Sequence, residues 1–561
     1  MSAARSSRAR WGVAVAVLLL AALALRLWGL RTGLPYVYNA DENAHFVPRA
    51  IGMFGHTYNP GYFINPPGFT YLLHVLFALR WGAEGVQDAY AADLGDVFGV
   101  ARAASAVLGT VAVGLLYVAG ARLFQDRRVA FLAAALLAVC FLPVFYSHFA
   151  LNDVPALAPL CLALVGVAGV LRSGRAADFA LAGAGIGLAC ATKYTAGIVV
   201  LCLLAAVVAG TSSVGRGRGV LLAGVVALGA FLVANPYALF DFDAFRDGLT
   251  KQSSASNDGG GKLGLTEDDG LRYYLSTLTW GLGWMPAAAA LGGAVGLAMR
   301  DRRLALVLVG PVVVFLLFMG LQDRFFARWL LPVFPLLCLL AAWGAVAFAD
   351  LLSRRLGARP ALAGGLAALA GLALCAQGIV TSVHNDAVLA RADTRQLVRD
   401  WMTANLPERA KVVVEPVFPD QWASDPGAGR PRWIKWATSR SRVNNDGTIR
   451  KGRGRIIKLE DYERTTRPEL VGAYARGGFC WVVTGSTQYG RALAEPEEVP
   501  NALRYYEELR RRGDVVFRAT PYSDGAERVP FSFDDSFNYR PLAYERPGPE
   551  IVVYRLRGCE A

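Results

Sequence analysis

The chain has 561 residues, 54% of them hydrophobic, and its mean hydropathy is +0.36. An average soluble domain is about 45–50% apolar, so this composition excludes a chain that is soluble throughout. The net charge is +13. The sequence carries no RNA-recognition or helix-turn-helix signature, and we expect no nucleic-acid partner.

Long runs of Ala, Leu, Val and Gly lie between residues 11 and 380. A helix needs about 20 mostly apolar residues to cross a bilayer. The sequence therefore predicts an α-helical polytopic membrane domain, residues 1–384, with about eleven transmembrane helices. The predicted spans are 11–30, 97–121, 129–147, 154–172, 178–192, 195–211, 219–235, 273–299, 304–320, 329–350 and 360–380.

Arginines recur in every second loop between these spans. Cytoplasmic loops are enriched in Lys and Arg. We therefore expect a plasma-membrane protein with its N-terminus in the cytoplasm and large outer loops at 31–96 and 236–272. The arginines that set this orientation are Arg5, Arg8, Arg10, Arg122, Arg127, Arg128, Arg172, Arg175, Arg216, Arg218, Arg300, Arg302, Arg303, Arg354, Arg355 and Arg359.

One apolar stretch, residues 66–81, is not counted as a span. If it crossed the membrane, every later basic loop would lie outside, against the positive-inside rule. The segment that follows it, residues 83–96, is acidic and has no Lys or Arg. We expect a helix that lies at or partly in the outer face, followed by an acidic loop.

Residues 385–561 predict a soluble extracytoplasmic α/β domain. Thr394–Asn405 and Leu503–Arg512 have helical patterns, and four Val-rich or aromatic segments predict strands. Cys480 and Cys559 either form a disulfide or are two separate buried thiols. The predicted strands are Lys411–Glu415, Phe479–Thr484, Val515–Ala519 and Ile551–Arg555.

Between these elements, residues 423–458 predict a strongly basic loop or arm. The arm either is an ordinary solvated loop or lies on the outer leaflet and recruits an anionic acceptor. Its basic residues are Arg430, Arg432, Lys435, Arg440, Arg442, Arg450, Lys451, Arg453, Arg455 and Lys458.

Asp41 and Glu42 form an acidic pair just after the first span. In a helix, Asp41 and His45 would lie one turn apart on one face, as a pocket wall or half of a metal site. The alternative is a solvated loop. Downstream, Pro66 and Pro67 fix an extended entry into the next helix and place Asn65 near these acids.

The later outer loops add further polar candidates. Asp153 follows His148 and precedes Pro155, so it either caps the next helix or brings a second acid to the same membrane face. Lys193 interrupts two apolar runs and either snorkels or binds a ligand. Arg324 and Arg328 lie on the outer side against the positive-inside trend, and arginines among aromatics suit a phosphate headgroup.

In this order the motifs resemble the GT-C-fold membrane glycosyltransferases, and specifically the bacterial-type members of the dolichyl-phosphate-mannose–protein mannosyltransferase-like family. The resemblance covers residues 31–380. One departure is Asn65, where many members have Lys before Pro-Pro. The motifs are Ala40-Asp41-Glu42, Asn65-Pro66-Pro67-Gly68-Phe69-Thr70-Tyr71, Leu151-Asn152-Asp153-Val154-Pro155, Thr192-Lys193 and Arg328-Trp329-Leu330-Leu331-Pro332-Val333-Phe334-Pro335.

The resemblance implies transfer of a hexose or pentose, such as mannose, from a polyprenyl-phosphate donor to an acceptor hydroxyl of a protein, lipid or glycan at the cell envelope. Asp41 would be the general base of an inverting displacement, and Glu42 and Asp153 would assist it. Lys193, Arg324 and Arg328 would bind the donor phosphate, with Lys193 or Arg324 taking the place of the missing Lys at Asn65. His45, Asn65 and His148 would complete the pocket.

We expect no cofactor and no bound metal, although Asp41, His45, His148 and Asp153 offer ligand atoms. The alternative function is a transporter or flippase for a lipid-linked saccharide. Such a protein would need polar groups near the membrane midplane and internal inverted repeats, and the sequence has few of the former and no detectable repeat.

Overall fold

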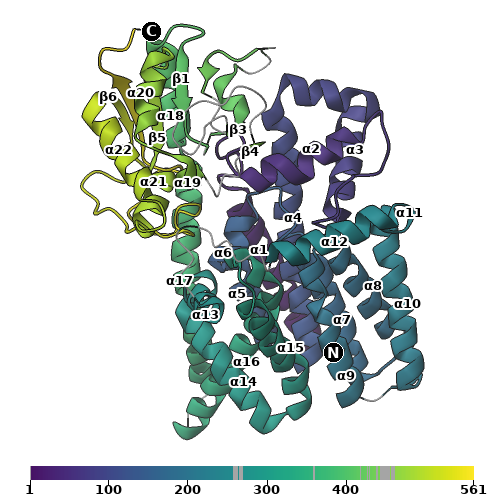
Figure 1. Ribbon diagram of the computed structural model, residues 1–561. Coiled ribbons are helices and arrows are strands. Elements are labelled where there is room, and N and C mark those ends of the chain that lie inside the picture. Colours follow the sequence, from purple (N-terminus) through teal and green to yellow (C-terminus); the bar gives the residue numbers. More distant parts are fainter. Residues whose placement is uncertain are drawn as a thin grey trace.

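A bundle of helices forms the lower part of the molecule and a smaller domain with a sheet lies above it in the computed structural model (Figure 1). The structure describes residues 2–560 except 211, 257–262, 264–268, 358–359, 417, 426–427, 429, 437–439, 442–454 and 457–461. The bundle helices are α1 (Ser2–Leu27), α4 (Leu94–Phe124), α5 (Arg127–Val139), α6 (Phe141–Tyr146), α7 (Leu157–Arg172), α8 (Ala176–Thr192), α9 (Val199–Ala209), α10 (Arg216–Ala234), α14 (Trp284–Arg300), α15 (Arg302–Gly320), α16 (Phe334–Arg355) and α17 (Pro360–Leu389).

Each predicted span overlaps a helical stretch of this bundle. Seven stretches within the described residues are long and apolar enough to cross a membrane, and the stretches around α7, α8 and α9 are apolar but shorter. The chain is therefore a multi-pass membrane protein, while the number of crossings stays a prediction. The seven stretches are Ala9–Leu27, Leu94–Phe124, Arg216–Ala234, Gly270–Arg300, Arg302–Gly320, Ala327–Arg355 and Gly364–Asn405.

Small residues bring the bundle helices into close contact. A Cβ atom on Gly183 or Gly187 of α8 would lie 2.3 or 2.1 Å from a backbone oxygen of α10. Only glycine permits this approach, which is the usual way helices pack where the lipid itself is apolar. The interior of the bundle is a continuous cluster of buried Ala, Leu and Val side chains.

Short elements cover the upper end of the bundle. Helix α3 lies across this end rather than along the bundle (Figure 1) and is not among the candidate spans. The expected acidic loop at 83–96 is wrong, because α3 continues to Ala92 past a kink at Gly82, where φ is +74°. The covering elements are η1 (Glu42–Phe46), α2 (Val47–Gly52), α3 (Gly68–Ala92), α11 (Tyr237–Phe240) and α12 (Phe242–Ser256). Four further elements continue directly into apolar stretches of the bundle: η2 (Tyr194–Ile198), α13 (Gly270–Leu278), η3 (Thr279–Gly283) and η4 (Ala327–Val333).

The C-terminal domain contains a mixed five-stranded sheet in the order β2-β1-β5-β7-β6, so the predicted α/β class is confirmed. Strand β1 pairs in parallel with β2 and β5, whereas β7 pairs antiparallel with β5 and β6. Cys480 and Cys559 form a disulfide. The elements are α18 (Thr394–Asn405), β1 (Lys411–Val414), η5 (Asp420–Ala423), β2 (Ile434–Lys435), β3 (Arg440–Ser441), β4 (Arg455–Ile456), α19 (Tyr462–Thr465), α20 (Glu469–Arg476), β5 (Trp481–Gly485), α21 (Ser486–Ala494), α22 (Pro500–Arg512), β6 (Gly513–Ala519) and β7 (Ile551–Leu556).

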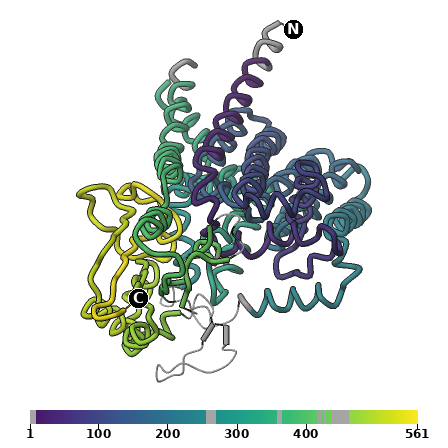
Figure 2. The backbone as a smooth tube through the Cα atoms, turned by 90° about the horizontal axis from the view of Figure 1, so that it is seen from above, coloured from purple at the N-terminus to yellow at the C-terminus, as the bar shows by residue number. Residues whose placement is uncertain are grey.

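Helix α17 leads from the bundle into the C-terminal domain, which lies to one side of the bundle when seen from above (Figure 2). The segment that follows α1, predicted to be the first outer loop, packs against α18 of this domain. Arg395 lies 3.7 Å from the ring centroid of Tyr38, and the Gln396 amide donates to the carbonyls of Gly33 and Leu34. These contacts fix the segment that leads to Asp41.

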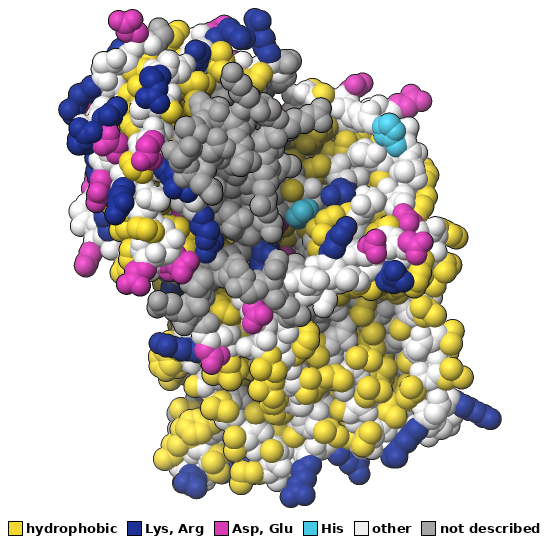
Figure 3. All heavy atoms as spheres, viewed as in Figure 1, with side chains coloured by type: hydrophobic (Ala, Val, Ile, Leu, Met, Phe, Trp, Pro, Cys, Tyr) yellow, Lys and Arg dark blue, Asp and Glu magenta, His cyan; other side chains and the backbone are white. Residues whose placement is uncertain are grey.

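The molecular surface separates into an apolar body and two polar ends. On the face seen in Figure 3, hydrophobic side chains cover the bundle, with Lys and Arg along its lower rim. Among the arginines predicted to be cytoplasmic, those whose side chains the structure describes are exposed. This distribution matches a protein that sits in a bilayer.

Candidate active site

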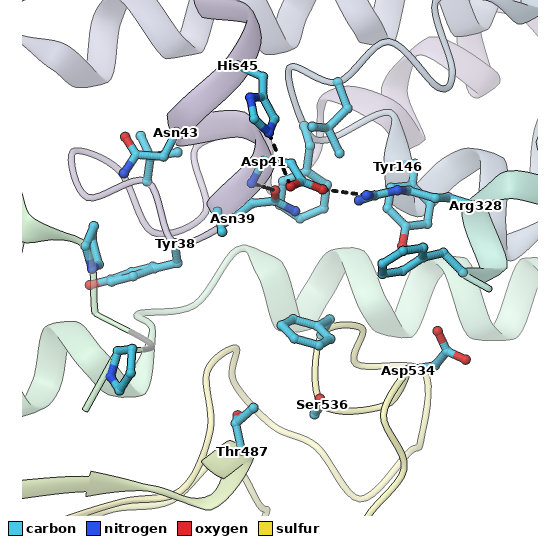
Figure 4. A pocket seen from close by; sticks show the side chains of 18 of the residues that line it. Tyr38, Asn39, Asp41, Asn43, His45, Tyr146, Arg328, Thr487, Asp534 and Ser536 are labelled. Atoms are coloured by element: carbon cyan, nitrogen blue, oxygen red, sulfur yellow. Dashed lines mark hydrogen bonds and ion pairs between the residues drawn. The ribbon is translucent and has the colours of Figure 1, made fainter. Parts of the chain in front are cut away.

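Asp41 lies at the upper end of the bundle and contacts both His45 and Arg328. The side-chain oxygen of Asn39 accepts hydrogen bonds from the backbone amides of Asp41 and Glu42, which starts the helical turn η1. His45 Nε2 then lies 3.7 Å from Asp41 Oδ1, as the one-turn spacing predicts. On the other side, Arg328 Nη2 lies 2.5 Å from Asp41 Oδ2 (Figure 4).

His45 stacks on Tyr62, with ring centroids 5.0 Å apart. Burial lowers the pKa of His45, although the Asp41 carboxylate acts in the opposite direction. His45 is therefore neutral at physiological pH and adds no charge. Asn65 donates to the Tyr62 hydroxyl at 3.0 Å, so it lies in the pocket as expected, but as a support for Tyr62.

Asp153 forms a buried ion pair with Lys193. The Lys193 ammonium donates to Asp153 Oδ1, and Arg328 Nε lies 3.9 Å from the same oxygen. The capping alternative for Asp153 is wrong, because α7 begins at Leu157 and its N-cap, Ala156, has no side-chain cap. Arg328 thus bridges two acids that lie 112 residues apart in the sequence.

Arg324 and Arg328 lie against the ring of Phe326, at 5.3 and 5.0 Å from its centroid. Arg324, Arg328 and Lys193 all line the same cavity. Guanidinium groups held on an aromatic ring present their N–H donors in a fixed plane, which suits phosphate oxygens. The structure therefore brings together the three cations that the sequence singled out.

Glu42, the neighbour of Asp41, points away from the cavity. Its carboxylate is fully buried and accepts hydrogen bonds from Arg102 at 2.7 and 2.9 Å and from the Ala150 amide at 2.9 Å. Glu42 is not among the residues that line the cavity. Its surroundings are those of a structural ion pair rather than of a group that meets substrate.

The expectation that His148 lines the pocket is wrong. His148 is fully buried in the bundle, where its ring nitrogens contact the backbone oxygens of Trp28 and Val144. Its Nε2 also lies 3.5 Å from Asp386 of α17. His148 and Asp153 are close in sequence, but their side chains lie in different surroundings. Asp153 lines the cavity, whereas His148 is buried among the helices.

The cavity has a volume of about 840 Å³, and the C-terminal domain forms part of its wall. Asp534, Ser536 and Thr487 come from this domain and lie across the cavity from Asp41 (Figure 4). These three residues are absent from the site predicted from the sequence. A signal was present, because the acidic pair Asp534-Asp535 between aromatic residues repeats the pattern that singled out Asp41 and Glu42.

The basic arm falls largely outside the described residues, including Arg442, Arg450, Lys451, Arg453 and Lys458. Of the members that are described, Arg432 pairs with Asp425 at 3.1 Å, and Lys435 lines the cavity. In the part of the chain that the structure describes, no group of three or more His, Cys, Asp or Glu side chains is arranged to hold a metal ion.

Residues 88–237, about a quarter of the chain, match the family model described as dolichyl-phosphate-mannose-protein mannosyltransferase. This segment contains Asp153 and Lys193. The resemblance to that family is therefore confirmed for this part of the chain. No curated protein sequence matches the chain.

Solved structures of similar fold cover most of the chain. The Archaeoglobus fulgidus oligosaccharyltransferase in complex with Zn and sulfate aligns with a TM-score of 0.53 at 15% identity, over 91% of this chain and 72% of its own. The oligosaccharyltransferase AglB of that organism, in complex with an inhibitory peptide and a dolichol-phosphate, aligns with a TM-score of 0.50 at 13% identity. That alignment covers 92% of this chain and 73% of AglB.

The chain has a GT-C fold. ArnT from Cupriavidus metallidurans bound to undecaprenyl phosphate also matches, with a TM-score of 0.47, 16% identity and 98% and 99% coverage. Together, the GT-C fold and the family match support a membrane glycosyltransferase. They leave its donor, sugar and acceptor to be argued from the site.

Proposed function

We propose that this GT-C protein transfers a sugar from a polyprenyl phosphate to an acceptor hydroxyl at the extracytoplasmic face. The observation that carries the proposal is Arg328, which joins Asp41 and Asp153 inside the cavity. One cation bound by two acids is held in place, yet a phosphate can compete for it. The oligosaccharyltransferase AglB, which is similar in fold, is in complex with a dolichol-phosphate in its solved structure, which supports a lipid-phosphate donor here.

The charges at the site suit a phosphate leaving group. Asp41 and Asp153 balance Arg328 and Lys193, and Arg324 lies beside them. A sugar phosphodiester carries one negative charge, and the phosphate that leaves carries more. Cations placed against it therefore stabilise the transition state more than the ground state.

In the proposed reaction, the donor phosphate draws the Arg328 guanidinium toward itself, which frees Asp41 Oδ2. Asp41 then takes the proton of the acceptor hydroxyl. The acceptor oxygen attacks the anomeric carbon, the bond from that carbon to the phosphate oxygen breaks, and the phosphate leaves with the electron pair. Because attack and departure occur on opposite faces, the anomeric configuration inverts.

Two features support an outward-facing site. The exposed arginine loops lie at the opposite end of the bundle from the cavity, as the positive-inside rule requires. The Cys480–Cys559 disulfide also lies in the C-terminal domain, and disulfides persist in oxidising compartments. On this basis the N-terminus is cytoplasmic and the C-terminal domain is extracytoplasmic.

Asp41→Asn tests the proposed base. We expect loss of transfer by about 10²–10⁴-fold, because the amide keeps the shape of the side chain but cannot accept the proton. The assay uses purified protein in liposomes with a panel of undecaprenyl-phosphate-linked hexoses and pentoses, and measures the undecaprenyl phosphate released when envelope extract is added.

The matched control is Asp88→Asn, an exposed acid on α3 that does not line the cavity. It should behave as wild type. Wild-type release by Asp41→Asn would show that Asp41 is not the base. Equilibration of intact lipid-linked sugars across the liposome membrane, with no release of undecaprenyl phosphate, would instead favour the flippase alternative.

A further inference from the structure

One loop of the C-terminal domain, residues 531–540, lies between the cavity and the membrane domain. Its contacts with the membrane domain include three aromatic or polar pairs. Phe533 packs on Phe326 with ring centroids 6.3 Å apart, the Tyr273 hydroxyl donates to Asp534 Oδ2 at 2.7 Å, and Arg540 lies 5.4 Å from the centroid of a Trp280 ring. Phe326 is the ring on which Arg324 and Arg328 lie, so the loop touches the centre of the site.

Asp534 is the acid that this loop presents to the cavity. Its side chain is partly exposed and lines the wall beside Ser536 and Thr487 (Figure 4). Tyr146 lines the same cavity as Asp534, Asp41, Asp153 and Arg328, so all four charges belong to one site. Asp41 forms an ion pair with Arg328, and Asp153 forms one with Lys193. Within the described part of the membrane domain, the hydrogen-bond partner of Asp534 is the uncharged Tyr273.

We propose that Asp534 is an acceptor-positioning residue, which accepts a hydrogen bond from a hydroxyl or amino group of the acceptor next to the hydroxyl that reacts. This inference rests on the proposed function. A negative charge repels the donor phosphate, so Asp534 suits the other substrate. Its wall also belongs to the aqueous domain, whereas a lipid-linked donor approaches from the membrane. The short hydroxyl side chains of Ser536 and Thr487 on the same wall suit an acceptor rich in hydroxyl groups.

The acceptor is therefore neutral or cationic near its reactive hydroxyl. An acceptor with a carboxylate or phosphate at that position would face the charge of Asp534 and bind less well. Tyr273 orients the carboxylate through the 2.7 Å hydrogen bond and comes from the membrane domain. The membrane domain thus aligns a specificity residue that the C-terminal domain supplies.

The test compares substrate constants in the liposome assay. The acceptor probes are octyl glycosides of neutral hexoses, the matching uronic acid glycosides and a threonine-containing peptide. If the protein glycosylates none of these probes, envelope extract is the source of acceptor. For Asp534→Asn we expect an acceptor KM at least 10-fold higher, a donor KM within about twofold of wild type, and a smaller preference for neutral over anionic glycosides. Asp524→Asn, an exposed acid of the same domain, is the matched control.

The pH dependence gives a readout that a purely structural role would not change. Burial raises the pKa of Asp534 to about 6, with Asp535 acting in the same direction and Tyr273, Arg540 and Arg328 opposing it. Tyr146 and Tyr274 also lie near this carboxylate. Wild-type acceptor KM should rise as the pH falls through about 6, because the carboxyl gains a proton. Asp534→Asn should lack this rise. Tyr273→Phe should move it to higher pH, since the lost hydrogen bond held the pKa down.

The outcomes separate the two proposals. Unchanged acceptor KM and pH profile in Asp534→Asn, with transfer still dependent on Asp41, would overturn the role of Asp534 and leave the proposed function intact. If Asp534→Asn raises the donor KM, or lowers only the unfolding temperature, Asp534 does not position the acceptor and only holds its loop on the membrane domain. Failure of wild type to release undecaprenyl phosphate with any donor would count against the proposed function itself.

Discussion

Asp41 and Glu42 are adjacent and chemically similar, yet they face opposite environments. Successive residues in a helix are rotated by about 100°, so one side chain can enter the cavity while the next enters the core. Asp41 is 41% exposed and contacts Arg328, whereas the Glu42 side chain is fully buried against Arg102. The sequence pattern predicts the same role for both acids, and only the packing shows that their surroundings differ.

Glu42→Gln should therefore destabilise the protein, while Asp41→Asn should not. Arg102 is 1% exposed, and the amide leaves its charge without a counterion in the core, a loss that costs about 3–5 kcal/mol. Thermal unfolding of the detergent-solubilised variants, followed by tryptophan fluorescence, measures the difference. Equal unfolding temperatures for the two variants would contradict this assignment.

The sequence predicts which residues belong to the site, but it does not predict which of them form ion pairs with one another. Asp41 stands out because it belongs to an acidic pair after the first span, and Arg328 stands out because it is an arginine on the predicted outer side. Their ion pair joins positions 287 residues apart, and no local pattern encodes such a contact. For Asp153 the local sequence is misleading. It fits a helix N-cap, but the carboxylate forms an ion pair with Lys193.

At the scale of elements, local patterns located most helices and strands well. Helix α18 spans Thr394–Asn405 as expected, since a capping box at Asp393 marks its start. Strands β1, β5, β6 and β7 overlap the four predicted segments. Helix α3 is longer than expected. Its acidic residues beyond Gly82 face water on an amphipathic helix, and acidic residues are as common on such a surface as in a loop, so their presence did not indicate a loop.

Glu415, at the end of β1, should make the stability of the C-terminal domain depend on pH. Its carboxylate is buried and accepts from the Gly485 amide at 2.6 Å and from Tyr506 at 2.7 Å. Burial raises its pKa to about 8 from an ordinary value of 4.5. Between these two values the folded domain holds a proton that the unfolded chain has released, so stability falls as the pH rises, by at most about 1.4 kcal/mol per unit.

Pulse proteolysis of the full chain in urea, at several pH values from 5 to 8.5, measures this effect on the C-terminal fragment. Glu415→Gln should flatten the dependence. Glu408→Gln, whose side chain is 73% exposed in wild type, should leave it unchanged. A wild-type domain equally stable at both ends of this range would show that Glu415 ionises normally.

At the scale of the whole molecule, the membrane orientation determines which substrates can meet the site. Positive charge lies at the end of the bundle opposite the cavity, and the disulfide lies on the cavity side. Both observations agree with the orientation expected from the arginine pattern. The arginine pattern is a property of the whole chain, so the orientation can be predicted from the sequence without knowledge of any contact, and it stays a prediction.

Cysteine labelling tests the orientation. Ser254→Cys on α12 and Arg303→Cys at the start of α15 place exposed thiols at opposite ends of the bundle. In intact cells, a membrane-impermeant maleimide should label position 254 and should reach position 303 only after permeabilisation. The reverse pattern would invert the topology and place the cavity in the cytoplasm.

The strand order of the C-terminal sheet has a consequence for biogenesis. Strand β7 follows β5 and β6 in the chain but lies between them, and it hydrogen-bonds to both. In the proposed orientation, β6 therefore has no partner in the sheet until residues 551–556 have been made and exported. Asp534 lies between β6 and β7 in the chain, so the part of the wall that it forms is completed only then. On the proposed function, in which Asp41 and Arg328 act on the donor side and Asp534 on the acceptor side, a chain still being exported lacks its acceptor side.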